Sequence, residues 1–358
     1  MHIQSFFRSV GAVSAAWYLF LLGAAAGVLP LGCANPAPAY SELSVMTWNV
    51  EALFDGHDDG TEYAEYREAQ GWGEEKFQSR LTAIAQAFGL MENGPPDVAV
   101  FIELENKGVL DLLAEEYLSK ANYQQGYFAK SDGQALGTGV LSRFPVTKTL
   151  SHSYFRDGKS IPRPVSEVWI EANGAEIAIL VCHWKSKLGK PEESQALRDD
   201  AAVVVRRISE EIRAEREAEG KPAVPILLAG DFNQTAAEFF GDDFPFPVTR
   251  DREDFRQILP DTDAPLFWTP WDTELDGGSY YYRGEWESID HFFLSRAFFD
   301  GNGWDYSGVE ALSGAPWTGN NGLPQSFNPR TGSGLSDHLP LLLKLALDRN
   351  GGTTQLAE

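Results

Sequence analysis

The sequence SVMTWNVEALF, residues 44–54, begins as a short apolar run and then turns polar at Asn49. An apolar run of this length, bounded by polar residues, is typical of a buried β-strand. The polar residue therefore follows the strand directly. Working outward along the chain, we find the same arrangement several times.

Other predicted strands are also flanked by acidic, amide or histidine side chains. Glu103 follows residues 97–102, His183 follows 177–182, Asp231 and Asn233 follow 226–228, Asp290 and His291 lie at the start of 289–294, and Asp337 and His338 precede 339–345. Polar groups at strand ends can converge on one crevice of an α/β or layered sheet protein. We therefore expect these side chains to form a single site.

These residue types suit phosphate ester hydrolysis. Carboxylate and amide oxygens are ligands for Mg²⁺ or Mn²⁺ rather than for zinc. Such a cation neutralises and orients a phosphate. A histidine held by a carboxylate acts as an acid or a base near neutral pH.

The motifs TWNV, FIELEN, HWKS, GDFN, IDH and SDHLP occur in this order between residues 43 and 347. As an ordered set they resemble the endonuclease/exonuclease/phosphatase superfamily. That resemblance implies an α/β (α+β) fold, a four-layer α/β sandwich of two packed, mostly antiparallel β-sheets flanked by helices. It also implies an active site at one end of the sandwich.

The resemblance assigns roles by position. The implied metal ligands, for Mg²⁺ or Mn²⁺, are Asn49, Glu103 and Asp337. The implied catalytic residues are His183, Asp231, Asn233, Asp290 and His338. In this scheme His183 lies beside the leaving-group oxygen, and Asp290 polarises His338.

Some positions depart from the family pattern or stay open. Ile102 stands where a glutamine is usual, and Glu51 is a further candidate neighbour of the metal. Each motif by itself also fits a structural role. Asp231 and Asn233 after Gly230, for example, suit an Asx turn. His291, one residue into its strand, is interpreted as structural.

The first 33 residues are interpreted as an export signal. A positive end precedes the apolar stretch 10–29, and Cys33 follows Gly32 as in a lipoprotein signal. An uncleaved membrane anchor and ordinary cleavage are the alternatives. All three place the main domain outside the cytoplasm, membrane-anchored, periplasmic or extracellular. Residues 34–42 are a short tether, 43–348 the phosphoesterase domain, and 349–358 a C-terminal tail.

The net charge of −23 argues against passive binding to polyanions, since a nucleic-acid binder usually presents a basic surface. It does not exclude a nuclease, because carboxylates that hold cations form a locally positive site. The two cysteines have no zinc-type spacing. Aromatic residues at 267–271 and 279–286 suit either base stacking or core and hairpin packing, and the second interpretation is preferred.

Periodicity predicts three helices and two long loops. Phe77, Leu81, Ile84, Ala85 and Phe88 share one helical face, and residues 109–118 and 191–219 are further helices. Residues 241–270 and 313–334 are loop-rich, and the second leads directly into SDHLP. We expect it to border the active site.

The first function hypothesis is an exported, metal-dependent nuclease acting on DNA or RNA. The second is a phosphoesterase for lipid or inositol phosphates, including sphingomyelinase-like cleavage, attached to the membrane by its N-terminal lipid or anchor. The third is a non-catalytic binding protein on the same fold. We expect a monomer in each case.

Overall fold

The structure is a computed structural model that describes residues 41–156, 159–161, 163–241, 244–257 and 265–348. The predicted export signal at 1–33 and the C-terminal tail at 349–358 lie outside the described residues, as does the tether up to residue 40. Within the described ranges, no helix is both long and apolar enough to cross a bilayer.

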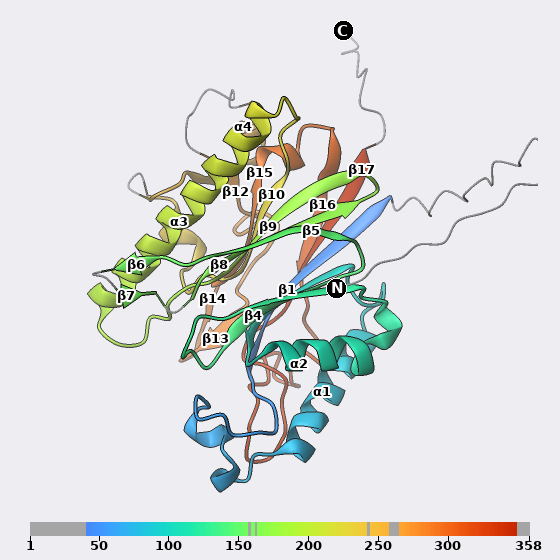
Figure 1. The fold of residues 1–358 in the computed structure, drawn as a ribbon, viewed down its shortest axis with the longest axis vertical. Coiled ribbons are helices and arrows are strands. Elements are labelled where there is room, and N and C mark those ends of the chain that lie inside the picture. The colour runs from blue at the N-terminus through green and yellow to red at the C-terminus, as the bar shows by residue number, and fades with distance from the viewer. Residues whose placement is uncertain (1–40, 157–158, 162, 242–243, 258–264, 349–358) are drawn as a thin grey trace, which may run out of the picture. The chain divides into compact units, whose positions relative to one another are not determined.

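Two β-sheets form the centre of the fold (Figure 1). The first contains, in spatial order, β16 (Gly303–Ala311), β17 (Leu341–Asp348), β1 (Glu42–Leu53), β2 (Val98–Leu104), β4 (Gly137–Ser142) and β3 (Gln125–Ala129). The second contains β11 (Val248–Thr249), β12 (Phe267–Trp268), β15 (Asp290–Ser295), β10 (Ile226–Asp231), β9 (Ala175–His183), β8 (Val165–Ala172) and β5 (Val146–His152). Only β1–β2, β9–β10 and β11–β12 pair in parallel, so both sheets are mostly antiparallel as predicted.

Helices cover the outer faces of the two sheets. α1 (Glu74–Gly89) and α2 (Lys107–Leu112) pack on the first sheet, and α3 (Pro191–Ala218) packs on the second. α4 (Arg252–Gln257) is short. The remaining elements are the hairpins β6 (Phe155–Arg156) with β7 (Lys159–Ser160) and β13 (Tyr280–Tyr282) with β14 (Glu285–Glu287), and the single turns η1 (Ala64–Tyr66), η2 (Glu68–Gln70), η3 (Leu113–Tyr117), η4 (Ser119–Ala121), η5 (Ala236–Phe239) and η6 (Arg296–Phe298).

Three apolar clusters hold these layers together. One lies between the sheets, where Val100 and Leu343 of the first pack with Val181 and Leu227 of the second. The other two lie between each sheet and its helices. Alternation along the strands sends successive side chains to opposite faces, and each face is buried by a different layer. The four-layer sandwich expected from the sequence is therefore confirmed.

Most predicted elements occur close to their expected positions. The helical stripe of α1 is buried at Phe77, Leu81, Ile84 and Phe88. The last strand begins at Leu341 rather than at the predicted Leu339, because Leu339 donates its N–H to Ser279 and the following proline has none to donate. Residues 241–270, predicted as loop-rich, include the short elements β11, α4 and β12.

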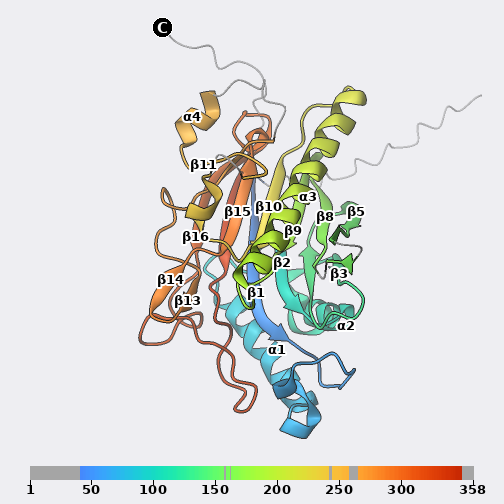
Figure 2. The ribbon, with the colours of Figure 1, turned by 90° about the vertical axis from the view of Figure 1, so that its left-hand side faces the viewer.

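The strand directions place the candidate residues at one end of the sandwich. β1, β2, β9 and β10 end there, whereas β15 and β17 start there because they run antiparallel to β10 and β1. The β13–β14 hairpin and the segment after β16 extend from the same end (Figure 2). Polar side chains at these strand termini are thereby brought together.

Candidate active site

Strand register aligns three candidate residues in one row across the second sheet. Asp231 of β10 pairs with His183 of β9 on one side and with Asp290 of β15 on the other. All three side chains are almost fully buried. His183 Nε2 lies 3.9 Å from Asp231 Oδ2 and 3.5 Å from Glu103 Oε1 on the facing sheet.

On the facing sheet, the candidate residues Asn49, Glu51 and Glu103 lie where the pairing of β1 with β2 becomes irregular. The register shifts after Asn49, and Glu51, Ala52 and Glu103 have positive φ angles of 55°, 53° and 72°. Such angles are uncommon for residues with a side chain and mark backbone held by its surroundings. Glu103 Oε2 accepts a hydrogen bond of 2.8 Å from the Ala52 N–H.

Arg80 of α1 holds this irregular backbone in place. Its guanidinium is 1% exposed and donates to the carbonyls of Val50, Glu51 and Ala52. Phe327 lies under its plane, 3.7 Å from the guanidinium carbon to the ring centroid. The sequence analysis missed Arg80. Its position three residues after Phe77 and four before Ile84, on the apolar stripe of the helix, is the signal of a buried arginine with partners.

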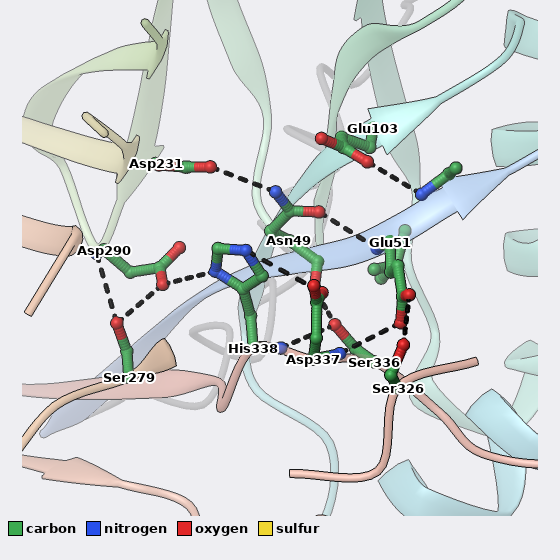
Figure 3. Close-up of polar contacts among 12 residues, drawn as sticks. Asn49, Glu51, Glu103, Asp231, Ser279, Asp290, Ser326, Ser336, Asp337 and His338 are labelled. Atoms are coloured by element: carbon green, nitrogen blue, oxygen red, sulfur yellow. Dashed lines mark hydrogen bonds and ion pairs between the residues drawn. The ribbon is translucent and has the colours of Figure 1, made fainter. Parts of the chain in front are cut away.

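Asp290 and His338 form a buried pair between β15 and the chain just before β17 (Figure 3). His338 Nδ1 lies 2.7 Å from Asp290 Oδ2, which also accepts a hydrogen bond of 2.6 Å from the Ser279 hydroxyl. Burial disfavours a charged His338, but the charge and hydrogen bond of Asp290, together with the charges of Asp337 and Asp231, outweigh it, so the pKa of His338 lies well above its usual value. The shift favours the imidazolium form of His338, whose Nε2 lies 3.8 Å from Asp337 Oδ1.

Asn49 links the two sheets at the centre of the site. Its amide nitrogen donates to Asp231 Oδ2 at 3.1 Å, and its amide oxygen accepts from the Glu51 N–H at 2.9 Å (Figure 3). Asp231 Oδ1 accepts from both nitrogens of Asn233, each at 2.9 Å. Burial, with the charge of Asp290, raises the pKa of Asp231 to about 7.

Three carboxylates approach one another beside Asn49. Burial, together with the charge of Asp337, raises the pKa of Glu51 to about 7. Burial likewise raises the pKa of Asp337, and Glu103 adds to the effect. Carboxylates that repel one another in a partly buried site are stabilised by a bound cation.

The predicted loop at 313–334 contacts this acidic group. Glu51 accepts from the Ser326 hydroxyl at 2.5 Å, the Phe327 N–H at 2.6 Å and the Asp337 N–H at 3.0 Å. The loop therefore borders the candidate site, as the sequence analysis expected.

His183 lies among positive charges. Burial lowers the pKa of His183 well below its usual value, and the charges of Arg163 and Lys185 lower it further. Arg163 donates to the carbonyl of Trp184, the residue after His183. Arg163 and His183 also line a small cavity together. The sequence analysis did not identify Arg163, which lies outside every motif.

Aromatic side chains extend from His338 toward solvent. The Tyr280 ring lies 4.6 Å from the His338 ring, and Tyr282 stacks on Tyr280 at 6.0 Å with an interplanar angle of 17°. Tyr282 is 41% exposed. Residues 280–287 form the predicted hairpin, whereas Phe267, Trp268 and Trp271 are core residues.

The structure brings all eight predicted site residues to this end of the sandwich. Among the described acids and histidines at this end, ligand atoms of Asp231, Asp290 and His338 lie within 4.8 Å of one another. Because His338 and Asp290 are already hydrogen-bonded, we interpret that set as a proton-handling network. His291 lies apart from it, fully buried, with Nε2 2.9 Å from the Gln234 carbonyl oxygen.

Several solved structures share this fold. A truncated TDP2 of Caenorhabditis elegans matches with a TM-score of 0.50 and 17% identity over 85% of this chain and 97% of its own. The human nocturnin catalytic domain with bound sulfate matches with a TM-score of 0.50 and 14% identity over 86% and 95%. A family protein of Bacteroides thetaiotaomicron matches with a TM-score of 0.50 and 17% identity over 86% and 98%. At these identities the likeness concerns the fold alone.

The sequence itself gives the family. No curated protein matches the chain. The model of the endonuclease/exonuclease/phosphatase family matches residues 44–346, which is most of the chain and includes every candidate site residue. This chain belongs to the endonuclease/exonuclease/phosphatase family.

Proposed function

We propose that this protein hydrolyses phosphodiester bonds with the help of a divalent cation, and that its substrate is a nucleic acid. The observation that carries the proposal is the Asp290–His338 pair at 2.7 Å, which faces the carboxylates of the other sheet. Members of the family are hydrolases that act on phosphoester bonds, typically with a divalent metal.

The residues present fit such a cation. Glu51, Glu103 and Asp337 offer oxygen atoms; the charge of Asp337 raises the pKa of Glu51, and the charge of Glu103 raises that of Asp337. Hard oxygen donors suit Mg²⁺ or Mn²⁺, so we propose one of these, held by Glu103, Asp337 and Asn49 with Glu51 nearby. When bound, the cation neutralises charge on the phosphate and orients it.

The buried pair supplies a positioned proton. Asp290 fixes His338 through Nδ1 and leaves the Nε2 proton for a phosphate or leaving-group oxygen. Asn49 and Asn233 hold the Asp231 carboxylate, whose raised pKa suits the acceptance of a proton from attacking water.

We propose that the side of the site around His183, where Arg163 and Lys185 lie, binds the phosphate. Arg163 and Lys185 lie beside His183 and favour an anion there. Neutral His183 can donate or accept a single hydrogen bond but is a poor source of a proton. We therefore propose that His338, rather than His183 as expected from the resemblance, protonates the leaving oxygen.

The Tyr280–Tyr282 stack favours a nucleic acid over other phosphodiesters. It starts on His338, where the phosphate would lie, and ends at the exposed ring of Tyr282. Stacking of a base on an aromatic side chain contributes about 1–3 kcal/mol in single-strand binding. A nucleotide flanking the cleaved bond fits this arrangement.

Exposed apolar side chains favour a lipid phosphate as the second candidate. Phe155 of the β6–β7 hairpin is 68% exposed, and Leu188, after the HWKS motif, is 74% exposed. The hairpin precedes Arg163, whose guanidinium contacts Trp184 beside His183. Apolar residues in such a position can enter a membrane surface.

A substrate panel with matched variants separates the two. The full chain is assayed with Mg²⁺ on plasmid DNA, RNA, sphingomyelin vesicles and inositol phosphates, alongside Tyr282→Ala and Phe155→Ser. We expect nucleic acid to be cleaved fastest, a loss of about tenfold in Tyr282→Ala from the missing stack, and no change in Phe155→Ser. A preference for sphingomyelin that is lost in Phe155→Ser would instead establish the lipid candidate.

A further inference from the structure

The loop after β1 carries acids that the proposed catalysis does not use. Residues 55–62, DGHDDGTE, are here named the acidic loop. One ligand atom from each of Asp59, Glu62 and Glu105 lies within 4.8 Å of the others. Glu105 comes from the segment after β2, so two separate parts of the chain meet at this point.

Glu105 has an unpaired carboxylate oxygen in this cluster. The residue is 0% exposed, and its Oε1 has no hydrogen-bond partner among the described residues. Its Oε2 accepts one hydrogen bond, of 2.6 Å, from the Asp55 N–H. Its neighbours in the cluster, Asp59 and Glu62, are themselves acids. A buried carboxylate without a partner and beside like charges is costly.

The acidic loop orients its carboxylates toward a common centre. The two oxygens of Glu62 accept from the Asp59 and Gly60 N–H groups at 2.6 and 2.7 Å. Gly60 has a φ of 92°, which favours glycine, so this tight turn is compatible with the residue at that position. These backbone contacts use one lone pair on each Glu62 oxygen, and the carboxylates of Asp58 and Glu105 lie within reach of the same group.

We propose that the acidic loop and Glu105 bind a calcium ion, at a site separate from the catalytic one. All the donors are oxygen atoms, and calcium takes six to eight of them at about 2.3–2.6 Å. Donor atoms that share one such ion lie no more than about 5 Å apart, and those of this cluster all lie within 4.8 Å of one another. Magnesium needs a smaller and more regular octahedron, and zinc prefers nitrogen or sulfur.

The calcium site would stabilise the strand ends that carry the catalytic acids. The Glu105 N–H donates to the Leu53 carbonyl at 3.0 Å, and only Leu104 separates Glu105 from Glu103. The acidic loop follows directly on β1, which carries Glu51. An ion bound only in the folded state raises the stability of this region.

Calorimetric titration of the full chain with Ca²⁺ tests the proposal, with the catalytic site disabled by Glu103→Gln in every sample. We expect one Ca²⁺ per chain in Glu103→Gln itself. Adding Asp59→Asn, an exposed member of the cluster, should weaken binding at least tenfold, and adding Glu105→Gln should abolish it. Glu65→Gln removes the same charge from an exposed position nearby and should leave binding unchanged.

A second readout guards against misfolding of the Glu105 variant. At a Ca²⁺ concentration near the dissociation constant of Glu103→Gln, the ion should raise the unfolding temperature of Glu103→Gln and of Glu103→Gln/Glu65→Gln clearly more than that of Glu103→Gln/Asp59→Asn, a comparison that does not need the Glu105 variant. No Ca²⁺ bound by Glu103→Gln, or equal binding by its Asp59→Asn and Glu65→Gln derivatives, would overturn the proposal. Glu62 and Glu105 would then share a proton instead.

Discussion

His338 and Asp290 are joined by a 2.7 Å contact between Nδ1 and Oδ2, although 48 residues separate them in the chain. Both are buried, and Ser279 donates a further hydrogen bond to the same Asp290 oxygen. A carboxylate in this position fixes the tautomer of the histidine and favours its protonated form. The pair is thus built to hold a proton where the phosphate would bind.

Asp290→Asn should remove the negative charge while keeping a similar shape. The pKa of His338 would fall, since Asp290 contributes most to raising it, and the imidazolium form would be less favoured. We expect phosphodiesterase turnover to drop by about 10²–10⁴-fold. Asp276→Asn, the same change at an exposed position in the preceding segment, is the control and should keep full turnover. Equal turnover of Asp290→Asn and Asp276→Asn would show that the Asp290–His338 pair does not take part in catalysis.

The identity of the proton donor can be read from leaving-group dependence. His338→Ala and His183→Ala should each lose activity on a nucleic acid. An aryl phosphodiester with a leaving group of low pKa needs no protonation, so it should restore the activity of the variant that lacks the acid. We expect that variant to be His338→Ala. Rescue of His183→Ala alone would restore the assignment suggested by the family resemblance.

Ser326→Ala should weaken cation binding, because Ser326 is the loop residue whose hydroxyl donates to Glu51. It removes a hydrogen bond of 2.5 Å to Glu51, worth about 1 kcal/mol. We expect the Mg²⁺ concentration for half-maximal activity to rise about fivefold, with little change in maximal rate. Ser333→Ala lies in the same loop, and its hydroxyl pairs with that of Thr331 at 2.7 Å, so it serves as the matched control. An unchanged Mg²⁺ requirement in Ser326→Ala would show that the loop does not support Glu51.

His291 should make the protein less stable in mild acid. Burial lowers the pKa of His291 from 6.5 to about 4. The unfolded state therefore binds a proton below pH 6.5 that the folded state refuses until about pH 4. Stability should fall across this window by up to about 3 kcal/mol. Urea unfolding in EDTA at pH 7 and pH 4.5 should show a smaller loss in His291→Gln than in the wild type, with exposed His57→Gln resembling the wild type. Equal losses in all three would contradict the assignment.

The part of the site that could be predicted from sequence is the part that lies at strand ends. Asn49, Glu103, His183 and Asp231 each follow an apolar run, and the parallel pairs β1–β2 and β9–β10 bring such ends together. The family resemblance added the pairing of Asp290 with His338. Periodicity alone would not have given that contact, since it joins two loop-adjacent residues through the packing of both sheets.

The supporting residues could not be predicted because they depend on three-dimensional packing. Arg80 has partners only once β1 bends at Glu51, and Arg163 is near His183 only because its segment folds over Trp184. Glu105 follows a predicted strand in the polar segment ELEN, a pattern typical of a solvated loop acid, yet it is fully buried. Of these three residues, only Arg80 has a local sequence signal of its role, because it is a charged residue on the apolar face of a predicted helix.

The central claim is that a cation held by acids of this site drives phosphodiester cleavage. The most direct measurement is the rate of cleavage of an activated aryl phosphodiester by the wild type and by Glu103→Gln, in EDTA and across a Mg²⁺ titration. Our account predicts no activity in EDTA, recovery with Mg²⁺ or Mn²⁺, and a Glu103→Gln variant that folds normally but stays at least about 10²-fold less active at every Mg²⁺ concentration. Full activity of the wild type in EDTA, or a fully active Glu103→Gln, would contradict it.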